Sequence, residues 1–363
     1  MSFSEADVQG ALKDLIDPNT RKSFAVGKSV KNIKISGNDI SLDIVLGYPA
    51  QSVWGEIRAM VEAHLKAALP GSSVNVNVTS KVVQHAVQHG AKLVDGVRNI
   101  IAVASGKGGV GKSTTAVNIA LALAAEGARV GVLDADIYGP SQPTMLGISG
   151  QPNVEDGNFM EPMTNHGLQA MSIGFLIGSE DTPMIWRGPM VVQALNQLLR
   201  QTRWDDLDYL IVDLPPGTGD IQLSLAQQVP VTGAVIVTTP QDIALMDARK
   251  GLKMFEKVGV KIVGIVENMS THICSKCGHE EHIFGAGGGE KMCADYNVEL
   301  LGSLPLDIRI REQTDSGKPT VVAEPDGQIA KVYKQIARRI AVRIAEMAQD
   351  RSALFPKVVV QNT

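Results

Sequence analysis

This sequence of 363 residues has no long apolar run, no excess of positive charge and few aromatic residues. No stretch of about 18 consecutive apolar residues occurs, which excludes an ordinary membrane-spanning helix. The formal net charge is −4, so no global positive field can hold a nucleic acid or an anionic membrane. The first ten residues, MSFSEADVQG, have no basic flank and no apolar core, and predict no signal peptide. We expect a cytoplasmic protein with no nucleic-acid partner.

Cysteine is also rare, with only three residues. In a reducing compartment an odd, small number favours metal ligands or core residues over disulfides. What is present is ordinary for a globular chain, namely 44% hydrophobic and 20% charged residues. The length predicts about two domains. Glycine, at 36 residues, exceeds its usual share and indicates many tight turns or close ligand contacts.

The chain divides into three parts by pattern. Residues 1–80 read as a small α+β domain of order αββαβ, with a helix capped by Ser4 and Asp7 and three strands of alternating polarity. Residues 81–98 lose this periodicity and read as a solvated linker, in which His85 and His89 are not expected to be metal ligands. From residue 99 to 363, short apolar strands alternate with helices. This alternation predicts an α/β fold with a mostly parallel sheet and helices on both faces.

A phosphate-binding motif follows the first strand of this α/β region. The residues GKGGVGKS from 106 to 113 fit the P-loop pattern, and a helix follows directly, so backbone N–H groups converge on phosphate oxygens. Lys112 is expected to neutralise the β- and γ-phosphates of ATP, and the Ser113 hydroxyl to bind Mg²⁺. The expected nucleotide contacts are Gly106, Lys107, Gly108, Gly109, Val110, Gly111, Lys112, Ser113 and Thr114.

Polar residues also follow three other predicted strands, at the sheet edge where ligands of such folds bind. Asp134 and Asp136 follow VGVL, Asp213 follows YLIV, and Asn268 follows IVGIVE. Asp213 is expected to hold Mg²⁺ through water and Asp134 to belong to the same Mg²⁺ network. Asn268 suits the adenine edge, because its amide both donates and accepts hydrogen bonds. Helix capping and turn formation are the alternative roles of these residues.

The pair Cys274 and Cys277 forms a CxxC motif with three possible interpretations. The two thiols can join His279 and His282 in a zinc site within one chain. They can form a redox pair, although that motif belongs at a helix start after a first strand. Alternatively, two chains can each give two thiolates and share one cluster on a dimer axis. Cys293 has no partner spacing and is expected in the core.

The P-loop with its second lysine, KGGVGKST, resembles the deviant form of the MinD, ParA, nitrogenase iron protein and ArsA group. This resemblance implies that Lys107 reaches the nucleotide of a partner subunit, in the manner of an arginine finger. It also implies that Asp136 orients the attacking water. A homodimer therefore satisfies both the P-loop and the shared-cluster interpretation of the cysteines.

Further motifs carry a closer resemblance, which spans about residues 99–325. They are WRGPM (186–190), DADIYGPS (134–141), DLPPGTGD (213–220), ENMS (267–270), the CxxC with its glycine, and IFGAGGG (283–289). Together they are similar to the Mrp/ApbC family of iron-sulfur cluster carrier ATPases. The N-terminal unit more weakly resembles the MIP18-like domain. Many such domains carry Cys before Pro, but here Tyr48 precedes Pro49, so no cluster ligand is expected in this unit.

The family resemblance implies slow, switch-type ATP hydrolysis and a [4Fe–4S] cluster bridged by Cys274 and Cys277 of two subunits. It also implies transfer of the cluster to apo iron-sulfur proteins and contact with cluster-assembly scaffolds. Two alternatives remain open, a MinD/ParA-like ATPase switch with a structural zinc site and an ATP-coupled electron-transfer protein. The amphipathic final helix, from about Gln328, is expected to pack on the sheet without stable membrane association.

Overall fold

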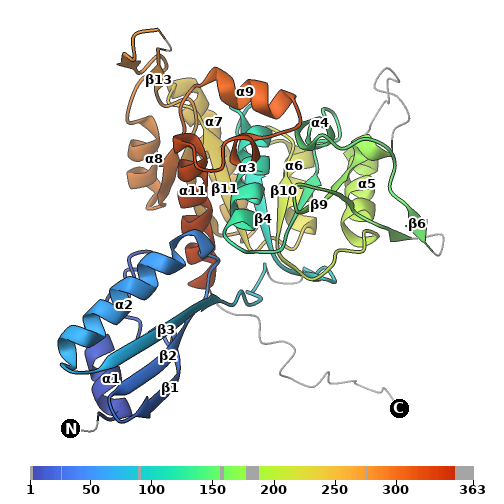
Figure 1. Cartoon of the computed structure of the whole chain (residues 1–363). Helices are drawn as coiled ribbons and strands as arrows, with labels where there is room; N and C mark the ends of the chain where they lie inside the picture. The colour runs from blue at the N-terminus through green and yellow to red at the C-terminus, as the bar shows by residue number, and fades with distance from the viewer. Residues whose placement is uncertain are drawn as a thin grey trace, which may run out of the picture.

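Alternating apolar and polar residues build a small sheet near the N-terminus. The computed structural model describes residues 3–25, 27–88, 91–155, 159–176, 188–274 and 276–347. Its first unit contains α1 (Glu5–Leu12), β1 (Val30–Ser36), β2 (Asp39–Leu46), the 3-10 turn η1 (Gln51–Val53), α2 (Trp54–Ala68) and β3 (Ser73–Ser80). β2 pairs antiparallel with β1 and parallel with β3, and both helices cover one sheet face (Figure 1). The predicted αββαβ order is confirmed, including the Ser4–Asp7 capping box.

Buried Val- and Ile-rich strands build the second, larger sheet. Among the described residues its strand order is β15-β12-β11-β4-β10-β5-β9-β8, and every neighbouring pair is parallel except β8 and β9. The strands are β4 (Val97–Ala104), β5 (Val130–Asp134), β8 (Met163–Asn165), β9 (Leu168–Ser172), β10 (Leu207–Asp213), β11 (Gly233–Thr238), β12 (Ile262–Glu267) and β15 (Leu300–Ser303). The predicted mostly parallel sheet is confirmed.

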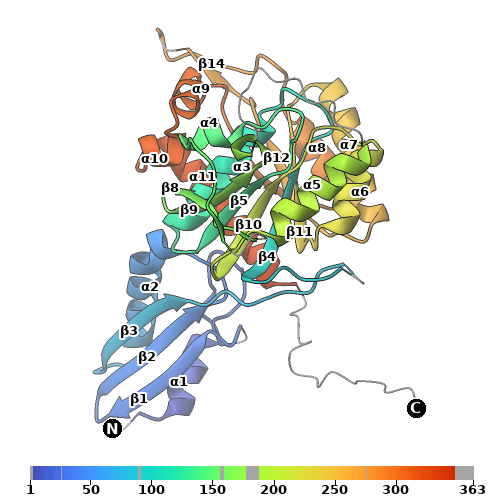
Figure 2. The ribbon, with the colours of Figure 1, turned by 90° about the vertical axis from the view of Figure 1, so that its right-hand side faces the viewer.

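Helices cover both faces of this sheet (Figure 2). One face carries α3 (Lys112–Ala125), α4 (Gln142–Leu146), α9 (Ile308–Asp315), α10 (Thr320–Ala323) and α11 (Gln328–Ala345). The other carries α5 (Gly188–Arg200), α6 (Asp220–Gln228), α7 (Asp242–Lys257) and α8 (Gly288–Tyr296). The apolar stripe of α11 is buried, as predicted. In the described part of the chain no helix is long and apolar enough to cross a bilayer.

Short elements complete the chain, and sequence periodicity did not predict them. They are β6 (Val154–Glu155), β7 (Phe159–Met160), the 3-10 turn η2 (Ile173–Phe175), β13 (His272–Ile273) and β14 (Glu280–Glu281). β8 and β9 were missed as well, because strands of three and five residues carry little alternation. Trp186 and Arg187 of the WRGPM motif lie outside the described residues, whereas its Gly188 begins α5.

His85 is packed against the larger unit, so the expectation that residues 81–98 form a solvated linker is wrong for this residue. Its side chain is buried, and its backbone N–H donates to Oδ1 of Asn99 at 3.1 Å. Gln88 donates to the carbonyl oxygen of Val229 at 2.6 Å. These partners lie in the body of the α/β unit, far along the chain, and local sequence does not report them. His89 lies outside the described residues.

A buried carboxylate joins the two units. Glu126, directly after α3, is fully buried and accepts from the Ser52 hydroxyl at 2.7 Å and the Ser52 backbone N–H at 3.0 Å. The same carboxylate is paired with the Arg338 guanidinium of α11. Because α3 begins at the P-loop, the small unit is attached to the far end of the helix that carries the phosphate motif (Figure 1).

Candidate functional site

The P-loop lies between the end of β4 and the start of α3. Gly109 and Gly111 have φ angles of 79° and 78°, in the left-handed region that favours glycine. Gly106 has no room for a side chain, because an added Cβ would lie 2.1 Å from the carbonyl carbon of Asp247 in α7. Gly108, in contrast, faces open space. The loop therefore presents its backbone, followed by the N-terminus of α3, to an incoming phosphate.

Lys112 is buried at the start of α3 and pairs with the buried carboxylate of Asp213 at the end of β10. Its ammonium also donates to the Ser113 hydroxyl at 3.1 Å. The second oxygen of Asp213 accepts from the Gln142 amide at 2.9 Å. The P-loop lysine thus contacts both the hydroxyl that follows it and the carboxylate at the end of another strand.

Asp134 ends β5 and is paired in register with Asp213 of β10. Its Oδ2 accepts from the backbone N–H groups of Ser141 and Gln142 at 2.9 and 3.0 Å, and from the Ser172 hydroxyl at 3.2 Å. Burial, reinforced by the Asp213 carboxylate, raises the pKa of Asp134 to about 7. The negative charge of Asp213 thus disfavours the ionised form of its neighbour Asp134.

The charges at this edge of the sheet fit a divalent cation. The fully buried carboxylates of Asp134 and Asp213 lie in register on neighbouring strands, and the Lys112 ammonium pairs with Asp213. The Ser113 hydroxyl lies beside this ammonium. Carboxylate and hydroxyl oxygens are the ligands that Mg²⁺ prefers, and a cation there would favour the ionised form of Asp134. Asp136 is half-buried nearby, and burial raises its pKa while the Lys112 ammonium opposes that shift.

Lys107 differs from Lys112 in its surroundings. It is half-buried, and its carbonyl oxygen accepts from the Ser105 hydroxyl at 2.9 Å. Its ammonium has no hydrogen bond or ion pair to any residue in the described ranges. The P-loop therefore carries two different lysines. Lys112 is paired with Asp213, whereas the ammonium of Lys107 has no partner among the described residues.

Asn268 lies against the P-loop. Its Nδ2 donates to the carbonyl oxygen of Val110 at 2.9 Å, and its backbone N–H donates to Thr238 at 2.7 Å. An added Cβ on Gly111 would lie 2.3 Å from this Nδ2. The amide N–H₂ that was expected to read the adenine edge thus has a partner in the protein.

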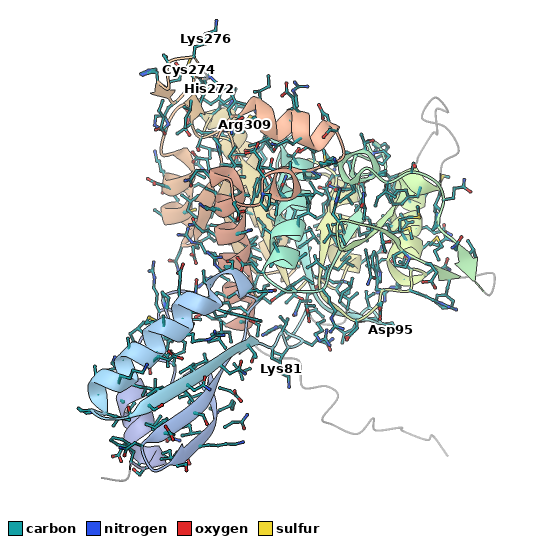
Figure 3. The ribbon with its side chains drawn as sticks, viewed as in Figure 1. Lys81, Asp95, His272, Cys274, Lys276 and Arg309 are labelled. Carbon is teal, nitrogen blue, oxygen red and sulfur yellow. The ribbon has the colours of Figure 1, made fainter. Side chains whose placement is uncertain are left out.

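Cys274 and Cys277 lie in a short hairpin between β13 and β14. Cys277 is exposed and Cys274 is half-buried. Hydrogen bonds from the backbone N–H groups of Lys276 and Cys277 lower the pKa of the Cys274 thiol, which favours a thiolate. Figure 3 shows Cys274 and Lys276 at the outer end of the hairpin, away from the body of the molecule. Ser275 lies outside the described residues.

A zinc site within one chain finds no support in the described residues. They hold no group of three or more His, Cys, Asp or Glu side chains arranged to bind a metal ion. Nδ1 of His282 instead donates to the carbonyl oxygen of Ser270 at 2.9 Å. Cys293 is buried in α8, as expected of a core residue, and burial raises its pKa to about 11. Each chain thus offers two thiols at one exposed tip.

Three functional-site neighbours were missed by sequence reasoning. Gln142 contacts Asp213, Ser172 contacts Asp134, and Glu267 accepts from the Gly289 backbone N–H at 2.5 Å. Ser172 and Glu267 each end a strand of the large sheet, which is the signal that also marks Asp134 and Asp213. Gln142 begins α4 and carries no comparable signal.

Comparisons with known proteins match both units of the chain. The sequence profile described as NUBPL iron-transfer P-loop NTPase matches residues 96–341, and one described as iron-sulfur cluster assembly protein matches residues 5–78. The iron-sulfur cluster carrier protein of Escherichia coli (strain K12) is 49% identical over 340 residues, which cover 93% of this chain and 92% of that protein. The mouse iron-sulfur cluster transfer protein NUBPL is 53% identical over 255 residues, covering 70% and 80%.

Solved structures agree on the fold. A nucleotide-binding protein from Archaeoglobus fulgidus, in complex with ADP, is 36% identical with a TM-score of 0.56 and covers 64% of this chain and 90% of that chain. The Pyrococcus furiosus cell division ATPase MinD is 24% identical with a TM-score of 0.51, covering 67% and 98%. The second likeness concerns the fold alone.

Proposed function

The chain belongs to the family of NUBPL iron-transfer P-loop NTPases, and we propose that it is an ATP-dependent carrier of iron-sulfur clusters. Two copies face each other, and Cys274 and Cys277 of both hold one bridging [4Fe–4S] cluster as cargo. The cluster is accepted from assembly scaffolds and delivered to apo iron-sulfur proteins. The observation that carries this proposal is a pair of thiols, one with a lowered pKa, at an exposed hairpin tip with no third ligand in the described chain.

An exposed two-thiol site suits a transferable cargo. A closed structural metal site needs four ligands, so two thiols leave half of the coordination to a second molecule. A second copy of the chain completes the set while the cluster is carried, and an acceptor's own cysteines replace those thiolates during delivery. The exposure of Cys277 gives such an acceptor access. A buried, complete site would hold a cluster that could not leave.

The same chain supplies the residues for ATP hydrolysis. Lys112 neutralises the β- and γ-phosphates, and it exchanges the Asp213 carboxylate for them when ATP binds. Ser113 and Asp213 would hold Mg²⁺, with Asp134 in the surrounding network; when bound, Mg²⁺ supplies charge neutralisation at the phosphates. Asp136 orients the attacking water, and its half-buried position beside Lys112 supports this role. Asn268 has its carbonyl oxygen to offer to the adenine, because its N–H₂ contacts Val110.

Lys107 acts across the dimer. Its ammonium is uncommitted within the described chain, whereas that of Lys112 is paired with Asp213. In the assembled dimer each Lys107 stabilises the transferring phosphoryl group bound by the partner. Turnover then requires two facing subunits, so hydrolysis is slow and linked to assembly, in the manner of a switch.

Anaerobic reconstitution with iron and sulfide tests the proposal. We expect a broad visible absorption band, iron and sulfide contents of one [4Fe–4S] cluster per two chains, and the mass of a dimer. Cys277→Ala loses the cluster, and Cys293→Ala, which removes a buried thiol outside the hairpin, keeps it. One tightly held zinc ion per monomer instead indicates a structural zinc site. A cluster that undergoes ATP-coupled reduction but is never transferred to an apo-protein indicates an electron-transfer protein.

A further inference from the structure

Four consecutive residues, 267–270, contact the P-loop and both limbs of the cysteine hairpin. On the P-loop side, Nδ2 of Asn268 donates to the Val110 carbonyl oxygen at 2.9 Å. The contact is close, because only the missing Cβ of Gly111 leaves room for this amide. Val110 and Asn268 are buried and lie 158 positions apart in the chain. A displacement of the Val110 carbonyl would therefore disturb this contact with Asn268.

The outgoing limb of the hairpin is held directly after this segment. Ser270 donates to the Leu304 carbonyl oxygen through its backbone N–H at 2.9 Å and through its hydroxyl at 3.0 Å. The next two residues of the limb also contact residues 304–306. The backbone N–H of Leu306 donates to the Thr271 carbonyl oxygen at 2.7 Å, and Nδ1 of His272 donates to the Leu306 carbonyl oxygen at 3.1 Å. His272 precedes Cys274 by two residues. The first thiol thus follows a fully hydrogen-bonded limb.

The returning limb ends on the same four residues. Nδ1 of His282 donates to the Ser270 carbonyl oxygen at 2.9 Å. Further on, the backbone N–H of Gly289 in α8 donates to the Glu267 carboxylate at 2.5 Å, and an added Cβ there would lie 2.3 Å from the carboxylate oxygen. The outgoing limb thus continues directly from this segment, and the returning limb is hydrogen-bonded to it through His282. The second residue of the segment, Asn268, also contacts the P-loop.

The backbone of this segment is in an unfavourable conformation. Met269 has a φ angle of 56°, which non-glycine residues rarely adopt. Its conformation is held by its neighbours, Asn268 on the P-loop and Ser270 on Leu304. Loss of one of those contacts would allow Met269 to relax towards a negative φ angle.

We propose that Asn268 is a positioning residue that transmits the nucleotide state of the P-loop to Cys274 and Cys277. When nucleotide binds, the Val110–Gly111 backbone adjusts around the phosphates, and the amide contact carries this change to residues 267–270 and to both limbs of the hairpin. Only the interpretation of the hairpin as the cluster site rests on the proposed function. Coupling between two sites is reciprocal. The factor by which nucleotide changes the affinity of the thiols for their ligand is therefore also the factor by which that ligand changes nucleotide affinity.

Thiol alkylation of the apo-protein measures the coupling without a cluster. The rates at Cys274 and Cys277 are followed by peptide mass spectrometry with iodoacetamide, with and without saturating Mg-ATP or Mg-ADP. We expect nucleotide to change the rate about fivefold or more, the lower end of ordinary allosteric coupling. The alkylation ratio is the rate with nucleotide divided by the rate without it. In Asn268→Ala, at nucleotide concentrations shown by titration to saturate the variant, this ratio falls to about one. An unchanged ratio in this variant overturns the proposal.

Asn118→Ala is the matched control, because it also removes a buried amide that touches the P-loop helix. Nδ2 of Asn118 donates to the Thr114 carbonyl oxygen at 2.9 Å, but its Oδ1 accepts from Val321, away from the hairpin. We expect this variant to keep the wild-type ratio. If the effect of nucleotide on alkylation disappears in Asn118→Ala as completely as in Asn268→Ala, loosening of the P-loop helix explains the loss. The specific role of Asn268 is then rejected.

A second variant covers the case in which Asn268→Ala fails to fold or to bind nucleotide. His282→Ala removes the contact with Ser270 and leaves the P-loop untouched. We expect normal nucleotide affinity together with a reduced nucleotide effect on alkylation, and a full effect contradicts the proposal. Failure of the proposed function is distinguishable, because it appears as the absence of a cluster after reconstitution, whereas the alkylation ratio is measured on the apo-protein.

Discussion

Lys112 and Asp213 form a buried ion pair that joins the start of the P-loop helix to the end of a neighbouring strand. Their side chains are 6% and 0% exposed, so neither charge has water as an alternative partner. In a site built for nucleotide this pair holds the lysine in place before phosphate arrives. The pair also makes the site part of the stability of the fold.

Asp213→Ala should therefore destabilise the protein strongly. The change leaves the Lys112 ammonium buried and unpaired, and breaking a buried pair in this way costs about 3–5 kcal/mol. Urea unfolding followed by circular dichroism measures the free energy of unfolding. Lys253→Ala, which breaks the exposed pair with Glu256, is the control and should leave the free energy of unfolding nearly unchanged. If both variants lowered the free energy of unfolding equally, the buried pair would stabilise the fold no more than an exposed pair does.

Lys107→Ala should abolish ATP turnover and spare the fold. A group that acts in trans on the transferring phosphoryl is worth about 10³–10⁵ in rate. Phosphate release at saturating ATP measures turnover, and thermal unfolding checks the fold. Lys250→Ala removes an exposed lysine of α7 and serves as the control. Near-normal turnover of Lys107→Ala is incompatible with a role across the dimer.

Two P-loop glycines should respond differently to alanine. In Gly106→Ala the new methyl group would lie 2.1 Å from the Asp247 backbone, so the loop or α7 must shift, and the melting temperature should fall by several degrees. In Gly108→Ala the methyl group meets open space and φ is ordinary, so the melting temperature should change little. Differential scanning calorimetry of the nucleotide-free protein compares them. A larger drop for Gly108→Ala would contradict the described loop.

His85 should make the protein less stable in mild acid. Burial lowers its pKa below the ordinary value of about 6.5, while a hydrogen bond with Asn99 opposes the shift. Between the two pKa values the unfolded chain binds more protons than the folded one. The stability that the neutral ring contributes is thus complete above about pH 6.5 and is lost as pH falls towards the lowered pKa.

Urea unfolding at pH 7.5 and pH 5.5 tests this dependence. In His85→Gln the difference between the two free energies of unfolding should shrink by at most about 1.4 kcal/mol, because pH 5.5 lies about one unit below the ordinary pKa of histidine. His279→Gln, at an exposed position, is the matched control for replacing a histidine. A His85→Gln protein with an unaltered pH dependence would mean that His85 titrates alike in both states.

Local patterns in the sequence predict the fold well, and they place the P-loop and the strand-end aspartates at the same edge of the sheet as the structure does. A glycine-rich loop between an apolar strand and a helix identifies the P-loop, and strand ends place Asp134 and Asp213 side by side because parallel strands share one carboxyl edge. The burial of His85 and the contact of Asn268 with Val110 were not predictable. Both depend on residues 14 and 158 positions away, whose pairing is decided by tertiary packing.

The carboxylate of Glu126 has a consequence for how the molecule is dissected. A fragment that lacks the small unit loses the Ser52 donors, so this acid would face water with only Arg338 as its partner. The same cut would uncover the end of the helix whose other end carries the P-loop motif. Kinetic constants of such a fragment would describe an altered enzyme, and the intact polypeptide is the proper object for measurement.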